Sequence, residues 1–352
     1  MRAGCITGGA GGVVSRLKTI IGKGVLSSER YIIYRSLQYT TVHTPKNPLP
    51  PYIKGAMIQR LASSPGLLRR AAAFSSTIAA TSTTSSSFSS SFSTTPASSS
   101  IKIDEVGVVG LGLMGHGICQ VAATCGSHGS IVAYEAENEF LIRGKERIVS
   151  SVDRLVSRGK MDRADADEAL GKIRYTTDPS DLGTADLIVE AVVEDMNLKR
   201  SLYADLDRHC KSDAIFASNT SSLSISEMAD VCGRPDRLVG VHFFNPAQIM
   251  KLVEVIYTPV TDPEVFDAAF DWVKALGKVP VRCGDNPGFI VNRLLIPNLV
   301  QAMLMLDRED ATIRDIDTAM KLGAGHPMGP IQLADYVGLD TCLYILSGWT
   351  EK

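Results

Sequence analysis

Two ionisable residues stand inside short apolar segments of this chain, where an isolated charge is costly. His242 ends the run Gly240-Val-His242, and Glu254 lies in the middle of Leu252-Val-Glu254-Val-Ile. A carboxylate in such a segment is stable only when it is paired. If the two segments form neighbouring strands, Glu254 accepts a hydrogen bond from one imidazole nitrogen and leaves the other nitrogen free as a base. The alternative is a structural histidine at a strand end and a charge on an edge strand.

Further polar side chains follow expected strands at the points where those strands end. Ser221 lies in the segment Ala217-Ser-Asn-Thr-Ser221, and Asn292 stands one turn into a helix that begins after Asn286-Pro-Gly. Ligands of open parallel sheets bind beyond the carboxyl ends of the strands. We therefore expect Ser221 to lie near His242, and Asn292 to face the same cleft from the helical region that follows. The alternative for Ser221 is a polar turn without a further role.

A glycine-rich turn supplies the third part of the expected site. Gly110-Leu111-Gly112-Leu113-Met114-Gly115 follows an apolar strand and opens a helix. In this pattern the glycines permit a tight turn, close approach to a pyrophosphate and close packing of helix on strand. Glu135, twenty residues further on, ends the second strand, where a carboxylate can hold both ribose hydroxyls and repel a 2′-phosphate. The pattern predicts NAD as the cofactor, rather than NADP; the alternative is an ordinary glycine-rich turn.

The elements that must position these residues fall into three regions. Residues 1–100 have no sustained helix or strand period, and the last quarter of them is almost entirely Ser, Thr, Ala and Phe, which predicts a disordered extension. Strands alternate with helices from Val106 to about residue 276, as in a doubly wound parallel sheet of the Rossmann type. Expected helices at 289–306, 313–322 and 331–345 then follow without strands. We predict a targeting extension over 1–100, an NAD-binding domain over 101–286 and an all-helical domain over 287–352.

The charge of the chain is distributed unevenly. Residues 1–100 carry eleven Lys or Arg against one acid, so the remainder holds 25 basic and 37 acidic residues. An acidic body repels phosphates, which argues against a nucleic-acid partner. The segment Met57–Arg70 has the arginines, the amphipathic pattern and the lack of acids that are typical of a mitochondrial presequence. We expect the mitochondrial matrix as the location, with a plastid as the alternative because of the serine content.

Metal and membrane binding are not expected. The seven cysteines form no C-x-x-C pair, and no group of His, Cys and acidic residues has the spacing of metal ligands. No apolar run approaches the roughly 20 residues that a membrane-spanning helix needs. The sequence therefore predicts reduced thiols, no metal and no membrane partner.

Taken in order, five segments resemble the successive signatures of the 3-hydroxyacyl-CoA dehydrogenase family, including its short-chain 3-hydroxybutyryl-CoA members. They read VGLGLMGHGI, SNTSSL, HFFNP with MKLVEVI, DNPGFIVNRLL, and DTAMKLGAGHPMGP, and they cover the chain from about Val106 to Trp349. The resemblance implies a Rossmann-type domain followed by a smaller helical domain, with NAD as cofactor. It also implies oxidation of a 3-hydroxyacyl-CoA substrate in fatty-acid β-oxidation.

The resemblance also implies a role for each matching residue. His242 is expected as the catalytic base, Glu254 as its orienting partner, and Ser221 and Asn292 as the groups that hold the substrate's C3 oxygen. Such a base contributes roughly 10²–10⁴ in rate by removing the hydroxyl proton as hydride leaves. Contacts with the cofactor are expected from Glu194, Lys199, Ser221 and Asn245, besides the glycine turn and Glu135. Contacts with the CoA moiety are expected from Ser151, Arg158 and Ser221.

The sequence departs from the family pattern at two places. The turn between Gly126 and Ile131 is slightly longer than usual, and the chain stops at Lys352, earlier than family members do. We expect the helical domain to be incomplete, which puts in doubt the homodimer that the resemblance implies. Two alternatives remain open: a non-catalytic protein of this fold, and a β-hydroxyacid dehydrogenase. The second would need a lysine in the long helix, where this chain has Asn292 and Arg293.

Overall fold

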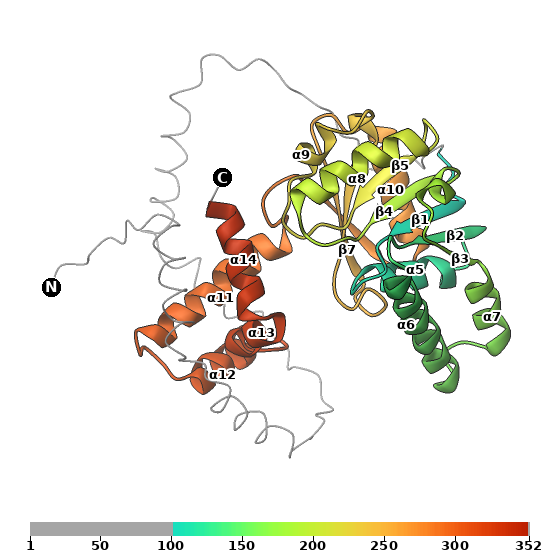
Figure 1. Ribbon diagram of the computed structural model, residues 1–352. Coiled ribbons are helices and arrows are strands. Elements are labelled where there is room, and N and C mark those ends of the chain that lie inside the picture. Colours follow the sequence, from blue (N-terminus) through green and yellow to red (C-terminus); the bar gives the residue numbers. More distant parts are fainter. Residues whose placement is uncertain (1–100, 351–352) are drawn as a thin grey trace, which may run out of the picture. The chain divides into compact units, whose positions relative to one another are not determined.

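A computed structural model describes residues 101–350, except the side chains of residues 344, 347, 348 and 350. The extension over 1–100, with its expected disorder and its targeting role, lies outside the described residues. Eight strands form one sheet in the order β3-β2-β1-β4-β5-β6-β7-β8 (Figure 1). The strands are β1 (Glu105–Val109), β2 (Ser130–Tyr134), β3 (Ile173–Thr176), β4 (Leu187–Glu190), β5 (Ile215–Ser218), β6 (Leu238–Phe243), β7 (Leu252–Tyr257) and β8 (Val279–Gly284).

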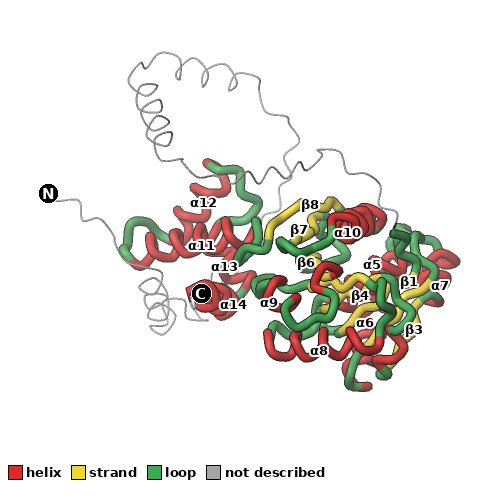
Figure 2. Tube along the Cα trace, turned by 90° about the horizontal axis from the view of Figure 1, so that it is seen from above, coloured by secondary structure: helices red, strands yellow, loops and turns green. Residues whose placement is uncertain are grey.

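Helices cover both faces of this sheet. They are α5 (Gly115–Thr124), α6 (Asn138–Ser157), α7 (Arg163–Gly171), α8 (Met196–His209), α9 (Ile225–Ala229) and α10 (Pro263–Ala275), with 3₁₀ turns η2 (Pro179–Leu182) and η3 (Pro235–Arg237). Apolar side chains of α5, α6, α7 and α10 form one buried cluster with one face of the strands, and those of α8 and α9 form a second cluster with the other face. Figure 2 shows α10 on one side of the yellow strands and α8 on the other. This confirms the Rossmann-type, doubly wound sheet.

One strand pair departs from the parallel pattern that the alternation predicts. β6 and β7 are antiparallel, whereas the other neighbouring pairs are parallel. Only residues 244–251 join β6 to β7, which is too short for the crossover that parallel strands require. The short connection therefore turns β7 back beside β6. β3 and β8 were not anticipated from the sequence, since each follows a helix at close distance without a long apolar run.

The remaining helices are α11 (Val291–Asp307), α12 (Ile313–Gly323), α13 (Pro330–Val337) and α14 (Leu339–Thr350). They enclose an apolar cluster of their own that includes Leu299, Met303, Ile316 and Ile331. The single helix expected over 331–345 is two helices, because the chain turns at Gly338 with φ of 99°. A left-handed backbone of this kind ends a helix readily at glycine. Within residues 101–350, no helix combines the length and the apolar character needed to cross a membrane.

Candidate active site

The antiparallel pair places His242 directly opposite Glu254. The two residues are register partners of β6 and β7, and Nδ1 of His242 lies 2.7 Å from Oε2 of Glu254. Directly opposite residues of an antiparallel pair have their side chains on the same face of the sheet. Both side chains are buried, with 4% and 1% of their surfaces exposed. The sequence left this pairing dependent on whether the two strands are neighbours, and the structure shows that they are.

The Glu254 carboxylate is held by more than the imidazole. Its Oε1 accepts hydrogen bonds from the backbone N–H groups of Ile290 (3.0 Å) and Val291 (2.9 Å), at the beginning of α11. Burial alone would raise the pKa of Glu254, but the hydrogen bonds from His242, Val291 and Ile290 outweigh it and lower the pKa. The carboxylate is therefore ionised and can only accept. Nδ1 of His242 then carries a proton, which leaves the Nε2 lone pair free to act as a base.

Two aromatic rings lie against the imidazole. The ring centroids of Phe244 and Phe289 are 4.5 Å and 5.6 Å from that of His242. Phe289 is buried and adopts φ of 50°, a left-handed conformation that side chains other than glycine rarely take. Such a conformation costs of order 1–3 kcal/mol and persists only where the surroundings hold it. The turn that carries Phe289 is thus fixed closely beside the expected base.

Cys283, on β8, also lies near Glu254, and burial together with the charges of Glu254 and Asp285 raises the pKa of its thiol to about 11.

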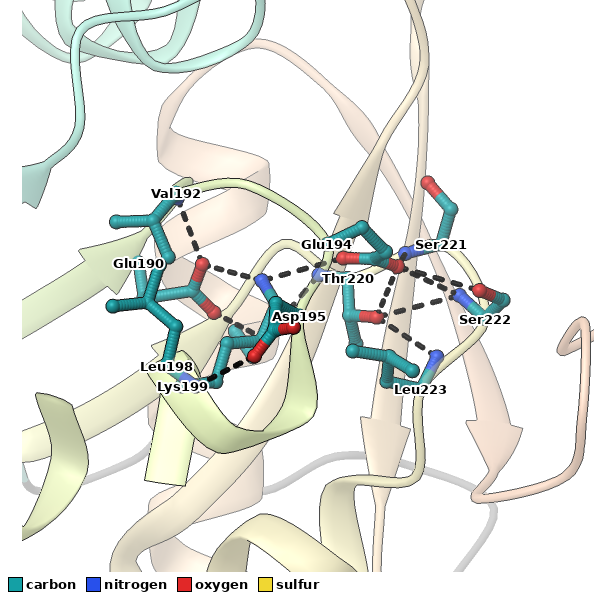
Figure 3. A network of polar contacts seen from close by, with 11 residues as sticks. Glu190, Val192, Glu194, Asp195, Leu198, Lys199, Thr220, Ser221, Ser222 and Leu223 are labelled. Carbon is teal, nitrogen blue, oxygen red and sulfur yellow. Dashed lines mark hydrogen bonds and ion pairs between the residues drawn. The ribbon is translucent and has the colours of Figure 1, made fainter. Parts of the chain in front are cut away.

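Ser221 and Asn292 meet at the end of β5. The Asn292 side-chain amide donates to the backbone oxygen of Ser221 over 3.3 Å. The Ser221 hydroxyl has no hydrogen-bond partner within residues 101–350, and it points away from the Glu194 carboxylate (Figure 3). Asn219 connects this loop to the strand of the base, because its Oδ1 accepts from the backbone N–H of Phe243 (2.9 Å). The ends of β5 and β6 are thereby fixed to each other.

Glu194 and Lys199 belong to a polar network beside the Ser221 loop. Oε1 of Glu194 accepts from the Thr220 hydroxyl (2.6 Å) and from the backbone N–H of Ser221 (2.9 Å). Lys199 lies 3.3 Å from Glu194 and 2.5 Å from Glu190, and both Lys199 and Glu190 are almost fully buried (Figure 3). In this arrangement Lys199 neutralises Glu190 and holds Glu194 in place. Direct contact of either residue with a cofactor stays a prediction.

The glycine turn has the shape that a dinucleotide needs. A Cβ on Gly110 would come within 2.9 Å of the Ala191 carbonyl oxygen, and one on Gly115 within 1.7 Å of the Gly110 oxygen. A Cβ on Gly112 would meet no atom within 4 Å, so open space lies over this residue at the start of α5. No side chain caps that helix start, and the first turn contains no acid. The residues present thus fit the pyrophosphate of NAD.

Glu135 directly follows β2, as the sequence pattern expects, whereas contact of Asn245 with a cofactor stays a prediction. Oε2 of Glu135 accepts from the backbone N–H of Leu111 (2.8 Å), so the carboxylate stands beside the glycine turn. Asn245 is exposed and lies in the loop between β6 and β7, three residues after His242. Glu135 is in a position to hold a ribose.

A basic cavity of about 350 Å³ lies beside the start of α5. It contains Ser151, whereas Arg158 follows the end of α6 and is not among the lining residues. The lining combines one acid with several groups that can hold phosphate oxygens: His116, Arg143, Glu146, Arg147, Ser150, Ser151, Arg154 and Gln248. Planar guanidinium groups bind phosphate in a bidentate manner. Gln248 belongs to the loop that follows His242, so this loop reaches from the base to the cavity.

Sequence reasoning missed three contributors to the site. They are the backbone donors at Ile290 and Val291, the ring of Phe289, and Asp285, whose carboxylate accepts from Ser224 and from two N–H groups at the start of α9. Backbone groups leave no signal in residue type. Asp285 was inside the quoted segment DNPGFIVNRLL, but nothing in its type points to α9. Within the described part of the chain, no three His, Cys, Asp or Glu side chains gather as metal ligands.

A dinucleotide turn after β1 of a doubly wound sheet, with a carboxylate-paired histidine near the end of β6 in the same sheet, defines an NAD-dependent dehydrogenase. Two family models match the chain: the NAD-binding domain of 3-hydroxyacyl-CoA dehydrogenase over residues 105–286 and its C-terminal domain over residues 288–352. The chain belongs to the 3-hydroxyacyl-CoA dehydrogenase family, an NAD-dependent family of oxidoreductases that act on hydroxyacyl-CoA.

Individual relatives agree with this assignment. The chain is 47% identical over 257 residues to the mitochondrial hydroxyacyl-coenzyme A dehydrogenase of Rattus norvegicus, covering 71% of this chain and 81% of the relative. It is 44% identical over 252 residues to 3-hydroxybutyryl-CoA dehydrogenase of Mycobacterium tuberculosis, covering 71% and 87%. The crystal structure of (S)-3-hydroxybutyryl-CoA dehydrogenase from Ralstonia eutropha superposes with a TM-score of 0.69 at 39% identity, covering 71% of this chain and 88% of that one.

Proposed function

We propose that this enzyme oxidises the 3-hydroxyl group of (S)-3-hydroxyacyl-CoA to the 3-oxo group, with His242 as the base and Glu254 as its orienting partner. The observation that carries the proposal is the 2.7 Å contact between Nδ1 of His242 and the buried Glu254 carboxylate. Because Nδ1 faces this carboxylate, the proton acceptor is Nε2. His242 stands near the carboxyl end of β6, where ligands of this sheet type bind.

The chain's own residues account for the movement of the proton. Nε2 of His242 takes the proton of the C3 hydroxyl as the C–H bond at C3 breaks, and the Glu254 carboxylate stabilises the resulting imidazolium. NAD⁺, when bound, supplies the acceptor for the hydride that leaves C3. Phe244 and Phe289 cover the imidazole and limit the access of water, which strengthens the interaction of the two charges. In the reverse direction the same imidazolium returns the proton to the oxygen.

Ser221 and Asn292 are the proposed donors to the C3 oxygen. The Ser221 hydroxyl is available for a ligand, and the Asn292 amide uses one N–H group in a contact of 3.3 Å with Ser221, which leaves its second N–H group. Donors that are already in place stabilise the negative charge that develops on the oxygen. The Glu194 carboxylate accepts from the backbone N–H of Ser221, so it helps to hold the loop that carries this donor.

The basic cavity beside α5 is the proposed binding site of the CoA phosphates. Ser151 was expected at the CoA moiety, and its neighbours Arg143, Arg147 and Arg154 supply the charge that phosphates need. The loop of Gln248 connects this cavity to the strand of His242, so a thioester-linked chain could extend along it. For Arg158 the same role remains proposed, from the end of α6.

Steady-state formation of NADH from (S)-3-hydroxybutyryl-CoA tests the proposal. We expect turnover by the wild type and a decrease in kcat of roughly 10²–10⁴ for His242→Gln. His209→Gln, at the exposed end of α8, is the matched control and should retain activity. Turnover of free 3-hydroxy acids without turnover of the CoA ester, or full activity of His242→Gln, would contradict the proposal.

We further propose the mitochondrial matrix as the location and fatty-acid β-oxidation as the setting. The basic, acid-poor extension over residues 1–100 supports this, and several relatives are named mitochondrial, although bacterial proteins match as well. A fluorescent protein fused behind residues 1–100 should enter mitochondria; entry into plastids would favour the alternative. The homodimer remains a prediction that sedimentation of the purified chain can test.

A further inference from the structure

The turn that joins β8 to α11 is held from two sides. On the site side, Phe289 lies against His242, and the N–H groups of Ile290 and Val291 bind Glu254. These contacts come from three consecutive residues. Any displacement of the turn therefore moves the Phe289 ring and both backbone donors of Glu254 together.

The other side of the turn is in contact with the last described helix. Gly288 adopts φ of 81°, and a Cβ placed on it would come within 2.2 Å of the ring of Trp349 in α14. The indole thus packs against the backbone of Gly288 with no room for a side chain between them. Arg293, the third residue of α11, donates its backbone N–H to the Gly288 oxygen (2.9 Å) and has its guanidinium 5.3 Å from the Trp349 ring. A cation at this distance is attracted by the face of an indole.

The Trp349 contact is made by the ring and not by its polar group. The indole Nε1 is buried, and it has no hydrogen-bond partner in the described part of the chain. A phenyl ring could therefore replace much of the contact without the loss of a hydrogen bond. An alanine could not, since it would leave a space beside Gly288 into which the turn can move.

We propose that Trp349 is a positioning residue for the oxidation: its ring presses on Gly288 and so holds the turn that carries Phe289 and the two backbone donors of Glu254. This rests on the proposed roles of His242 and Glu254. Trp349 itself touches neither residue, and its effect passes through one turn of backbone. α14, which follows β6 by almost a hundred residues, would thus set the geometry of the base.

Kinetics of the full-length chain with (S)-3-hydroxybutyryl-CoA and NAD⁺ test this inference. Trp349→Ala should lower kcat by about tenfold to hundredfold with little change in either KM, because misplacement of a catalytic group by about 1 Å costs up to that much. Trp349→Phe should recover most of the loss. Ile345→Ala, which removes buried apolar surface from the same helix, is the control. It should lower the melting temperature while kcat stays near the wild-type value.

The pH profile of kcat/KM adds a readout that a purely structural role would not change. A loosened turn weakens two of the hydrogen bonds that stabilise the charge of Glu254, so this carboxylate holds the imidazolium more tightly and the acid limb of the profile should move to higher pH in Trp349→Ala. If that variant does not fold, Arg293→Leu tests the same contact from an exposed position and should give a smaller change in the same direction. Wild-type kcat and pH profile in Trp349→Ala, while His242→Gln is inactive, would overturn this inference alone. Activity of His242→Gln would instead overturn the proposed function.

Discussion

His242 and Glu254 are register partners across the only antiparallel strand pair of the described sheet, with Nδ1 and Oε2 2.7 Å apart. They lie twelve positions apart in the chain, and a connection of eight residues returns β7 beside β6. The backbone hydrogen bonds of the pair thus fix the distance between the two side chains. The sheet sets the backbone positions of the base and its partner, and the turn before α11 completes the hydrogen bonding of the carboxylate.

Glu254→Gln tests the role of this carboxylate, because glutamine has nearly the same shape as glutamate. A glutamine can place its single oxygen toward His242 or toward the N–H groups of Ile290 and Val291, so one of these contacts must be lost. The imidazolium also loses its counter-charge. We expect kcat to fall by roughly tenfold to thousandfold, by analogy with loss of the carboxylate in histidine-based triads.

Stopped-flow measurement of NADH formation at saturating substrate separates this effect from weaker binding. Glu168→Gln is a suitable control, because Glu168 is exposed in α7 and forms an ion pair with Lys172 away from the site. Both variants should bind NAD as the wild type does. A Glu254→Gln enzyme with wild-type kcat would show that the carboxylate does not orient the base.

The residues of this site differ in how well the sequence predicts them. The glycine turn, Glu135 and His242 could be predicted, because glycine spacing and charges in apolar strands are properties of residue type. The pairing of His242 with Glu254 stayed conditional, since strand neighbours depend on the whole topology. The length of the connection between β6 and β7 carried that information, but the alternation of strands and helices favoured a parallel pair.

The contacts that the sequence did not predict depend on backbone groups and on burial. The N–H groups that hold Glu254 belong to Ile290 and Val291, whose apolar side chains give no sign of the contact. Lys199 is another case: a lysine at the start of a helix suggests an exposed charge, yet only 1% of its side chain is exposed. Its partner Glu190 ends a buried strand, and the pair became evident only in three dimensions.

Glu135 should determine the choice between the two dinucleotides. Its carboxylate stands beside the Leu111 N–H, where the adenosine ribose is expected, and it would repel a 2′-phosphate. Replacement by serine removes the charge and opens space for that phosphate. We expect the ratio of kcat/KM for NAD over that for NADP to fall by about tenfold to hundredfold in Glu135→Ser. An unchanged ratio, measured with both cofactors at one substrate concentration, would place the ribose elsewhere.

His128 should make stability depend on pH. Its Nε2 accepts from the Trp272 indole N–H (3.2 Å), and burial lowers the pKa of the imidazole, opposed by the Ile103 carbonyl and Asp104 and assisted by Lys172. The unfolded chain then binds the proton more readily, so stability falls as pH drops below about 6.5 toward the lowered pKa. Melting curves followed by tryptophan emission should show this loss. His128→Gln should flatten it, and His209→Gln should not.

Substitution by alanine should have different effects at two glycines of the dinucleotide turn: lower stability at Gly115 and weaker NAD binding at Gly112. A Cβ at Gly115 would lie 1.7 Å from the Gly110 oxygen, so the backbone must shift. We expect Gly115→Ala to lose about 1–3 kcal/mol of stability, or roughly 3–10 °C in melting temperature.

A Cβ at Gly112 meets no protein atom within 4 Å. Gly112→Ala should therefore melt like the wild type while its KM for NAD rises about tenfold or more, because the methyl group occupies the space proposed for the pyrophosphate. Calorimetry and NAD titration on both variants check the contrast, and normal NAD binding by Gly112→Ala would remove the pyrophosphate from this turn.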